Sequence, residues 1–315
     1  LCDCEMILDG SFSPLNGFMT KEDYTSVLET MRLENGDLFP IPIVLDVNER
    51  FSKKLNFDDE ILLRDKEGFQ IARMTIRSVW KPDLAKEAKF VYGTDDRFHP
   101  AVNYLFNQGN NIYVGGEIKK ITMPKHYDYN QYRLTPNAAK AKFNELGWKK
   151  IIAFQTRNPL HRAHVEMTFE SMKRLSANLF LHPAVGQTKP GDINHYVRVR
   201  CYEHVKKKYP KGSMLLGILP LAMRMGGPRE ALLHSIIRKN YGCTHIIIGR
   251  DHAGPGNNSS GKPFYGMYDA QKLLKKYQDE IGIQMEPFQF MAYFPDKKDY
   301  LPIEKSKNQE KYETI

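Results

Sequence analysis

An amide, a guanidinium and two imidazoles lie within residues 155–164, Gln-Thr-Arg-Asn-Pro-Leu-His-Arg-Ala-His. A guanidinium offers a planar fork of donors that matches the oxygens of a tetrahedral dianion. His161 and His164 are three residues apart, a spacing that places both rings on one face of a helical turn. We therefore expect Arg157, His161 and His164 to form an anion site. The alternative is a capped helix whose histidines are only solvated.

The residues around this stretch predict the strand and helix that position it. Residues 149–154 form a short apolar run with β-branched side chains, which is typical of a buried strand. Residues 165–175 contain no Gly or Pro and carry apolar side chains near helical spacing. We expect Asn158 to be the N-cap and Pro159 the first helical residue. The free N–H groups and the positive end of the helix dipole would then face the anion.

A second polar loop follows a second predicted strand. Residues 244–249 are apolar and β-branched, and residues 249–256 read Gly-Arg-Asp-His-Ala-Gly-Pro-Gly. Glycines let the backbone approach a ligand closely and present N–H groups to it. The Asp251 carboxylate can accept from hydroxyl groups or from a metal-bound water. The loop therefore indicates a ligand site, and a purely structural glycine-rich turn is the alternative.

A third stretch, residues 220–229, places Arg224 and Arg229 around Gly-Gly-Pro. It is either another site that holds an anion or a tight connection before a helix, and the sequence does not separate the two. Residues 188–192 predict a flexible loop with one cation, Lys189, and a lid is one interpretation of it.

Other catalytic classes lack their signatures. Two histidines at positions i and i+3 could bind zinc, but no third ligand and no zincin glutamate are evident in the sequence. There is no Gly-x-Ser-x-Gly elbow and no Walker A loop. Phosphate binding would therefore depend on the helix start, its histidines and the glycine loop.

The composition is that of an ordinary globular protein, and the net charge is basic. Of 315 residues, 41% are hydrophobic and 26% charged, and no stretch approaches the ~18 apolar residues of a membrane span. The net charge of +9 favours small anionic substrates. No zinc finger, RNP-like motif or arginine-rich tail points to nucleic acid. We expect the basic runs and two arginines to be solvated surface: residues 119–120, 206–208, 275–276 and 297–298, with Arg198 and Arg200.

Four cysteines in a chain of this length do not indicate a disulfide scaffold, so a reducing compartment is expected. The sequence begins at Leu1 without Met and shows no signal peptide. A cytoplasmic location is the default, and an organelle stays open because a targeting segment could precede this start.

The order of the predicted elements indicates two domains. Residues 1–134 contain short strands, among them a hairpin formed by residues 61–64 and 69–76, and suggest a small β barrel or sandwich. Residues 135–315 alternate strands with helices, which indicates a parallel α/β sheet. Ligands bind such sheets at the carboxyl ends of the strands, where both polar loops fall. We place the domain border between residues 134 and 135.

The two polar loops resemble the signature motifs of the ATP sulfurylase (sulfate adenylyltransferase) family. Supporting similarities run along nearly the whole chain, at residues 10–19, 188–202, 220–241, 264–266 and 293–296. The form of the first loop is closer to the fungal and bacterial enzymes than to the bifunctional animal ones. The resemblance implies an α+β protein with an N-terminal PUA-like β domain and a Rossmann-like nucleotidyltransferase domain with a parallel sheet.

The family reaction is transfer of AMP from ATP to sulfate, which gives adenosine 5′-phosphosulfate (APS) and pyrophosphate in the first step of sulfate activation. The resemblance implies Mg²⁺ with ATP, no metal held by the protein itself, and a homo-oligomer without nucleic-acid or membrane partners. The implied sulfate contacts are Gln155, Arg157 and the backbone of Ala253. The implied ATP contacts are Gln155, Thr156, Arg157, Asn158, His161, His164, Gly249, Arg250, Asp251, His252 and Met291. The implied catalytic residues are Thr156, Arg157, Asn158, His161 and His164.

Relatives in the family continue past the position of Ile315 into an Ile-Ser-Gly-Thr-type segment that contacts the phosphates. We therefore expect the C-terminal end to be truncated, and an APS kinase domain, fused in some relatives, is not in this sequence. Two rival hypotheses remain: a nucleotidyltransferase with another acceptor, and a nucleotide-binding module without turnover.

Overall fold

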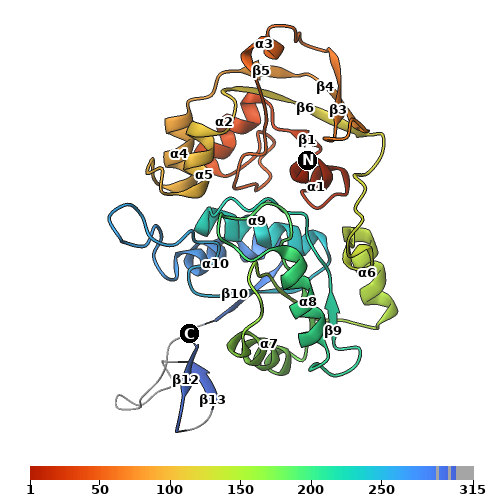
Figure 1. Cartoon of the computed structure of the whole chain (residues 1–315), viewed down its shortest axis with the longest axis vertical. Helices are drawn as coiled ribbons and strands as arrows, with labels where there is room; N and C mark the ends of the chain where they lie inside the picture. The colour runs from red at the N-terminus through yellow and green to blue at the C-terminus, as the bar shows by residue number, and fades with distance from the viewer. Residues whose placement is uncertain (289–290, 297–298, 303–315) are drawn as a thin grey trace.

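The computed structural model describes residues 1–288, 291–296 and 299–302, with the backbone alone at 291–292 and 299–302. The N-terminal region lies above the C-terminal region in Figure 1, and helix α9 lies where the two meet. Among the described residues, no helix is both long and apolar enough to cross a membrane.

The N-terminal region contains one antiparallel sheet built around its longest strand, β6. Its strands are β1 (Gly17–Phe18), β2 (Leu45–Val47), β3 (Glu60–Arg64), β4 (Gln70–Thr75), β5 (Ser78–Trp80) and β6 (Ile112–Lys120). The order is β1-β6-β4-β3, with β2 and β5 also paired to β6. The predicted hairpin is confirmed as β3 and β4. Gly115 lets the chain at Met19 pack against β6, because a Cβ there would lie 2.1 Å from the Met19 carbonyl oxygen.

Helices are more prominent in this region than the sequence prediction allowed. They are α1 (Cys2–Leu8), α2 (Lys21–Thr30), α3 (Glu49–Ser52), α4 (Leu84–Tyr92) and α5 (Pro100–Asn107). The region therefore combines the predicted short strands with these helices. The α4 helix is fixed at its start by the Asp83 carboxylate, which accepts from two backbone N–H groups, and at its end by Gly93 in a left-handed conformation. The sequence of residues 40–47, rich in β-branched side chains, predicts a strand, but only β2, Leu45–Val47, forms there.

The C-terminal region has the predicted parallel sheet. Its strands are β7 (Ile151–Phe154), β8 (Asn178–Leu181), β9 (Met214–Leu216), β10 (His245–Ile248) and β11 (Gln284–Pro287), in the order β11-β10-β7-β8-β9. The helices are α6 (Pro136–Glu145), α7 (Arg162–Leu175), α8 (His195–Lys206), α9 (Gly227–Asn240) and α10 (Asp269–Ile281), and a short 3-10 turn spans Asn130–Tyr132. The strand order changes direction between β7 and β10, so the loops that follow them flank the switch point, where ligands bind in such sheets.

An antiparallel pair, β12 (Met291–Phe294) and β13 (Asp299–Pro302), ends the described part of the chain. It projects below the parallel sheet in Figure 1. The sequence of residues 284–293 predicts one extended segment, but the structure has β11 in the parallel sheet and β12 in the antiparallel pair.

Arginines at the start of α9 attach the C-terminal region to the N-terminal one. Arg229 donates to the carbonyl oxygens of Val27, Leu28 and Pro40 at 2.9–3.2 Å. Arg224 donates to Asp3 at 2.7 Å. Neither arginine lines the cavity described below. Both guanidiniums are paired within the protein, which favours the alternative of a structural connection over that of an anion site.

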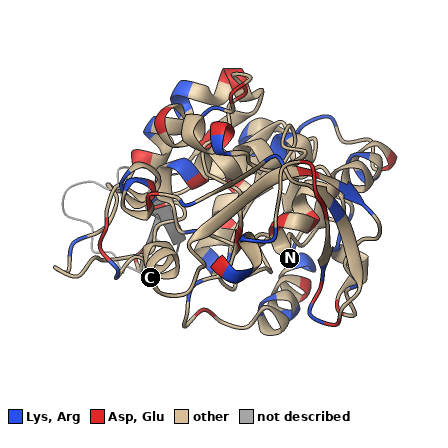
Figure 2. Cartoon of the chain, turned by 90° about the horizontal axis from the view of Figure 1, so that it is seen from above, with Lys and Arg blue, Asp and Glu red and all other residues tan. Residues whose placement is uncertain are grey.

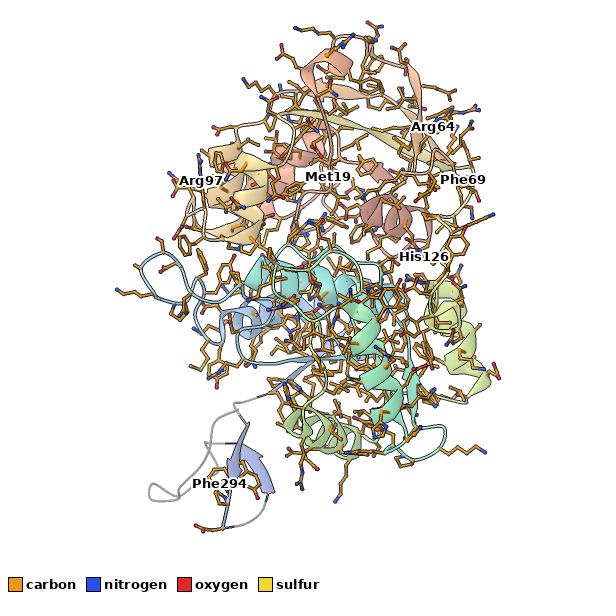
Figure 3. The ribbon with its side chains drawn as sticks, in the orientation of Figure 1. Met19, Arg64, Phe69, Arg97, His126 and Phe294 are labelled. Carbon is orange, nitrogen blue, oxygen red and sulfur yellow. The ribbon has the colours of Figure 1, made fainter. Side chains whose placement is uncertain are left out.

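Apolar side chains of the N-terminal region lie both in the core and on the surface (Figure 3). Met19 is buried, whereas Phe69 is 57% exposed. His126, in the connection between the two regions, contacts Glu5 at 2.8 Å. Lys and Arg residues and Asp and Glu residues are interspersed along the ribbon in Figure 2.

The basic runs are surface, as predicted, with two qualifications. Residues 119–120 and 275–276 are exposed, and residues 206–208 are exposed or half-buried. Residues 297–298 lie outside the described part. Arg200 is exposed, but Arg198 is only 2% exposed, so its assignment to the surface is wrong. Arg198 donates to the Ala184 and Ile193 carbonyls and so fixes the loop before α8. All four cysteines are free thiols.

Candidate active site

The two polar loops meet at one cavity of about 430 Å³ at the carboxyl ends of β7 and β10. The cavity brings together the predicted site residues Gln155, Thr156, Arg157, Asn158, His161, His164, Gly249, Arg250, Asp251, His252 and Ala253. Residues from the stretches 155–164 and 249–254, which are far apart in sequence, thus line the same cavity. Met291 is not among the lining residues; it begins β12, and its predicted adenine contact stays a prediction.

The first loop is shaped by Thr156, and the helix starts later than the sequence suggested. The Thr156 hydroxyl accepts from the Asn158 N–H and donates to the Asn158 carbonyl, both at 3.0 Å. The Tyr202 hydroxyl donates to the same carbonyl at 2.7 Å. Because these contacts hold Asn158 in a turn, helix α7 begins at Arg162 with His161 as its N-cap. The predicted N-cap at Asn158 and helix start at Pro159 are therefore wrong.

The two histidines do lie together at the helix start, with ring centroids 5.6 Å apart. The His161 backbone N–H donates to Nδ1 of His164 at 3.2 Å, so the neutral His164 ring carries its proton on Nε2. Burial, with a smaller contribution from His161, lowers the pKa of His164 to about 4. His164 is therefore a neutral hydrogen-bond donor at physiological pH.

Arg157 is paired inside the protein with Asp192, whose side chain is 7% exposed. The other Asp192 oxygen, Oδ2, is buried and has no hydrogen-bond partner among the described residues. Lys189, in the same loop, donates to the Pro255 carbonyl at 3.3 Å. The loop before α8 thus contacts both polar loops, and an anion that binds Arg157 must compete with Asp192.

The second loop is tightly folded. Asp251 and Ala253 have positive φ angles of 47° and 57°. A Cβ at Gly254 would lie 1.9 Å from Oδ1 of Asp251, so a larger residue there would displace that carboxylate. Burial raises the pKa of Asp251, and Arg250, Arg157 and Lys189 oppose this rise. The loop therefore places one carboxylate and several backbone groups at the cavity wall.

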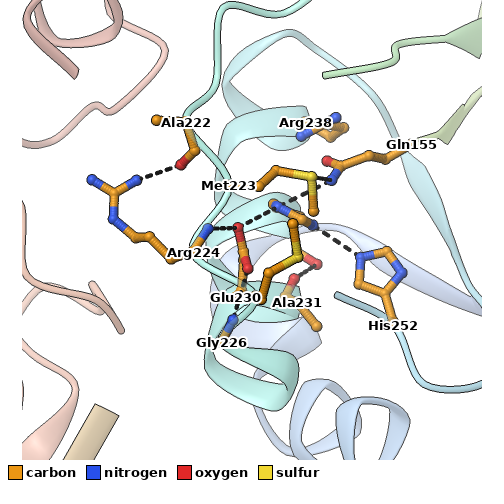
Figure 4. Close-up of polar contacts among 12 residues, drawn as sticks. Gln155, Ala222, Met223, Arg224, Gly226, Glu230, Ala231, Arg238 and His252 are labelled. Atoms are coloured by element: carbon orange, nitrogen blue, oxygen red, sulfur yellow. Dashed lines mark hydrogen bonds and ion pairs between the residues drawn. The ribbon is translucent and has the colours of Figure 1, made fainter. Parts of the chain in front are cut away.

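A buried polar network behind the cavity joins the two loops (Figure 4). His234 lies between Gln155, 3.1 Å from its Nε2, and His252, 2.9 Å from its Nδ1. Glu230 lies 3.4 Å from the His234 ring, and both side chains are fully buried. Burial lowers the pKa of His234 and of His252, so both rings are neutral.

Sequence reasoning missed this network and the apolar part of the wall, Phe154, Ala163, Met167, Met223 and Phe288. One signal was available for the network. Glu230, His234 and Arg238 are spaced by four residues, which places them on one face of a helix. Among the described residues, no group of three or more His, Cys, Asp or Glu could hold a metal ion, so the zinc alternative gains no support.

Family models match both regions of the chain. The ATP-sulfurylase model matches residues 130–315, and a PUA-like domain model matches residues 1–123. The expectation of a PUA-like domain followed by an α/β domain is confirmed.

Individual proteins agree with the family models. The chain is 53% identical over 306 residues to the sulfate adenylyltransferase of Schizosaccharomyces pombe, covering 96% of this chain and 62% of that protein. It is 53% identical over 305 residues to that of Yarrowia lipolytica, covering 96% and 53%. A solved structure titled a hexameric APS kinase from Thiobacillus denitrificans superposes with a TM-score of 0.78 at 27% identity, covering all of this chain and 54% of that one. The chain spans between half and two thirds of the length of these relatives, and it belongs to the ATP-sulfurylase family.

Proposed function

We propose that this chain is the catalytic part of a sulfate adenylyltransferase, which transfers AMP from ATP to sulfate. The observation that carries the proposal is the meeting of Arg157, His161 and His164 with the 249–254 loop in one cavity at the switch point of the sheet. The cavity combines cationic and neutral donors for anionic oxygens with a glycine loop that suits a nucleotide. Family membership agrees with this chemistry.

In the reaction, a sulfate oxygen forms a bond to the α-phosphorus, and the bond from that phosphorus to the bridging oxygen breaks. Pyrophosphate leaves with the electron pair. Sulfate carries no proton at neutral pH, so no general base is required. Sulfate is also a weak nucleophile, so catalysis must come from holding it in line and stabilising the charge that develops.

The residues divide between the two substrates. Gln155, Arg157 and the backbone of Ala253 bind sulfate. The Arg157 guanidinium leaves Asp192 when it binds the sulfate dianion. Thr156 and Asn158 shape the loop between the substrates. His161 and His164 donate to the phosphate oxygens as pyrophosphate leaves, and the neutral His164 does so through Nε2–H. Gly249, Arg250, Asp251, His252 and Met291 contact the nucleotide.

Mg²⁺ would enter with ATP. Asp251 is the one carboxylate among the lining residues, which suits an ion held mainly by phosphates and water rather than by a protein cage. When bound, the ion neutralises charge on the leaving pyrophosphate. We also propose that the protein assembles into a homo-oligomer and that its location is cytoplasmic or organellar. The domain border is proposed to lie between residues 134 and 135.

The test is ATP formation from APS and pyrophosphate with Mg²⁺. We expect turnover by the unaltered chain and a loss of at least ~100-fold in Arg157→Ala, the scale of removing one key charge-stabilising donor. Arg200→Ala is the matched control, because Arg200 is exposed on α8. ATP binding without turnover in the unaltered chain would overturn the proposal and favour a binding module.

A second assay separates sulfate from other acceptors. Pyrophosphate release from ATP is measured with sulfate, molybdate and nicotinamide mononucleotide. We expect pyrophosphate release with sulfate and with molybdate, and none with nicotinamide mononucleotide. Release with nicotinamide mononucleotide and not with sulfate would assign the chain to a different nucleotidyltransferase.

A further inference from the structure

Three polar residues of α9 form a fully buried row beside the cavity. Glu230, His234 and Arg238 follow one another at intervals of four residues, and each has a relative exposure of 0%. The row touches both cavity loops, because His234 contacts Gln155 of the first loop and His252 of the second. Burying three such groups is costly unless their contacts are specific, so the row needs an explanation.

The amide of Gln155 shows what the row does. Its Nε2 lies 3.1 Å from Nε2 of His234 and 3.8 Å from Sδ of Met223 (Figure 4). In this orientation both amide hydrogens are directed at protein atoms. The amide oxygen is buried and has no hydrogen-bond partner among the described residues. An amide turned this way has no hydrogen left to donate to an anion.

A half-turn of the amide resolves both problems, since its two ends have nearly the same size and shape. The oxygen would then face His234, and the NH₂ group would occupy the position of the unpartnered oxygen. This arrangement requires a proton on Nε2 of His234, so that the ring donates to the amide oxygen. Nδ1 of His234 would then accept from Nε2 of His252, 2.9 Å away.

Glu230 favours that tautomer. Its Oε1 lies 3.4 Å from Nε2 of His234, and the carboxylate also accepts from the N–H groups of Arg224 and Gly226 at 2.9 and 2.8 Å. Burial opposes ionisation, but the contacts with His234 and the two N–H groups hold the pKa of Glu230 below its ordinary value. An ionised carboxylate beside a ring nitrogen stabilises a proton on that nitrogen.

We propose that Glu230 and His234 are positioning residues that turn the Gln155 amide so that its NH₂ group donates to the bound oxyanion. Glu230 keeps the proton on Nε2 of His234, and His234 holds the Gln155 oxygen and the His252 ring. This proposal rests on the proposed function, in which Gln155 binds sulfate. It extends the site beyond the residues that reach the cavity.

The first test needs no substrate and no substitution in the measured protein. The ¹⁵N NMR shifts of the histidine rings, assigned with a His234→Gln variant, identify the protonated nitrogen of His234. We expect Nε2 to be protonated and Nδ1 to be unprotonated. A proton on Nδ1 would overturn the proposal, because Nε2 would then accept from the Gln155 NH₂ group.

The second test separates the two ring nitrogens by substitution. His234→Asn retains a polar group near the Nδ1 position and loses the one near Nε2, and His234→Gln does the reverse. We expect His234→Asn to raise the KM for sulfate about tenfold, the effect of one lost hydrogen bond to a charged group, and to leave the KM for ATP within twofold. His234→Gln should restore most of the sulfate affinity.

Two comparisons complete this test. Ser235→Ala, which removes only a bond inside α9 to the Ala231 carbonyl, should leave both KM values unchanged. Adding His234→Asn to the Gln155→Ala variant should cause no further rise in the KM for sulfate. If His234→Asn and His234→Gln raised the KM for sulfate equally, the role of His234 would be merely structural. The same would follow if His234→Asn raised this KM about tenfold in the Gln155→Ala variant as well. If the unaltered chain has no sulfate-dependent turnover, the proposed function fails, and the ring-nitrogen measurement still decides the tautomer.

Discussion

Two of the buried glutamates, Glu87 in the N-terminal region and Glu230 in the C-terminal region, have pKa values shifted in opposite directions. Glu87 on α4 accepts from the hydroxyls of Tyr24 and Tyr113 at 2.9 and 3.0 Å. Burial raises the pKa of Glu87 to about 7, because these hydroxyl bonds only partly offset it. Glu230 on α9 is held below its ordinary pKa by His234 and two backbone N–H groups, although burial opposes this.

The contacts of each buried glutamate indicate whether it supports the fold or the cavity. The contacts of Glu87 fasten α2, α4 and β6 to one another within the N-terminal region. The contacts of Glu230 lead through His234 to Gln155 and His252, which line the cavity. Changes around Glu87 should therefore alter stability, and changes around the cavity should alter catalysis.

The largest effect should come from the cavity. We expect His164→Ala to lower kcat by ~10²–10³-fold with little change in the KM for ATP, because its hydrogen bond strengthens as pyrophosphate leaves. Steady-state kinetics in the direction of APS synthesis would measure this. His126→Ala, a change in the connection between the regions, is the control and should leave kcat unchanged. A normal kcat with weak ATP affinity in His164→Ala would contradict the assigned role.

A smaller loss should follow from disturbing the second loop. A Cβ in Gly254→Ala would lie 1.9 Å from Oδ1 of Asp251, so the Asp251 carboxylate must move from its position at the cavity wall. We expect about a tenfold rise in the KM for ATP, equivalent to ~1.4 kcal/mol. Gly109→Ala is a suitable control, because its nearest contact would be an ordinary 3.4 Å to the Tyr104 ring. An unchanged KM would separate the loop from nucleotide binding.

The N-terminal network should respond through stability and pH. The folded state holds a proton on Glu87 up to pH about 7, whereas the unfolded chain releases it near the ordinary value of 4.5. The protonated Glu87 therefore makes its full contribution to the free energy of unfolding below pH 4.5. This contribution is lost as the pH rises to about 7. Glu87→Gln imitates the protonated form, so its Tm should exceed that of the unaltered chain by ~2–4 °C at pH 8 and by less at pH 5.

Thermal unfolding followed by circular dichroism at the two pH values checks this prediction. The kcat of Glu87→Gln should stay within twofold of the unaltered chain. A Tm gain that is no larger at pH 8 than at pH 5 would show that the pKa of Glu87 is not raised in the folded protein.

The smallest effect is expected on the surface. Lys275→Ala and Lys276→Ala remove exposed charges on α10. The free energy of unfolding should change by no more than ~0.5 kcal/mol, and kcat/KM should stay within twofold. A larger fall in kcat/KM that disappears at high salt would show that these lysines attract the substrates over distance.

The parallel sheet and the site loops were predictable because their signals are local. Residues 149–154 and 244–249 are short apolar runs that end in polar loops, and alternation with helices implies that the strands are parallel and neighbouring. The α4 helix carried local signals as well, Asp83 before it and Gly93 after it, and these were overlooked.

Other features depend on contacts between distant residues. An Asn-Pro pair commonly starts a helix, but Thr156 and Tyr202 hold Asn158 in a turn, and no local pattern shows the Tyr202 contact. The role of Glu230 and His234 depends on which face of α9 meets the loops that follow β7 and β10. Because α9 is buried on nearly all sides, the alternation of polar and apolar residues does not identify that face.

The most direct test of the account is a crystal structure of this chain with APS bound. We predict that the phosphosulfate lies between Arg157 and His164, that Arg157 has left Asp192, and that the adenosine lies along residues 249–252. APS bound at another cavity, or an Arg157–Asp192 pair unchanged beside bound APS, would contradict the claim that the two loops form one catalytic site.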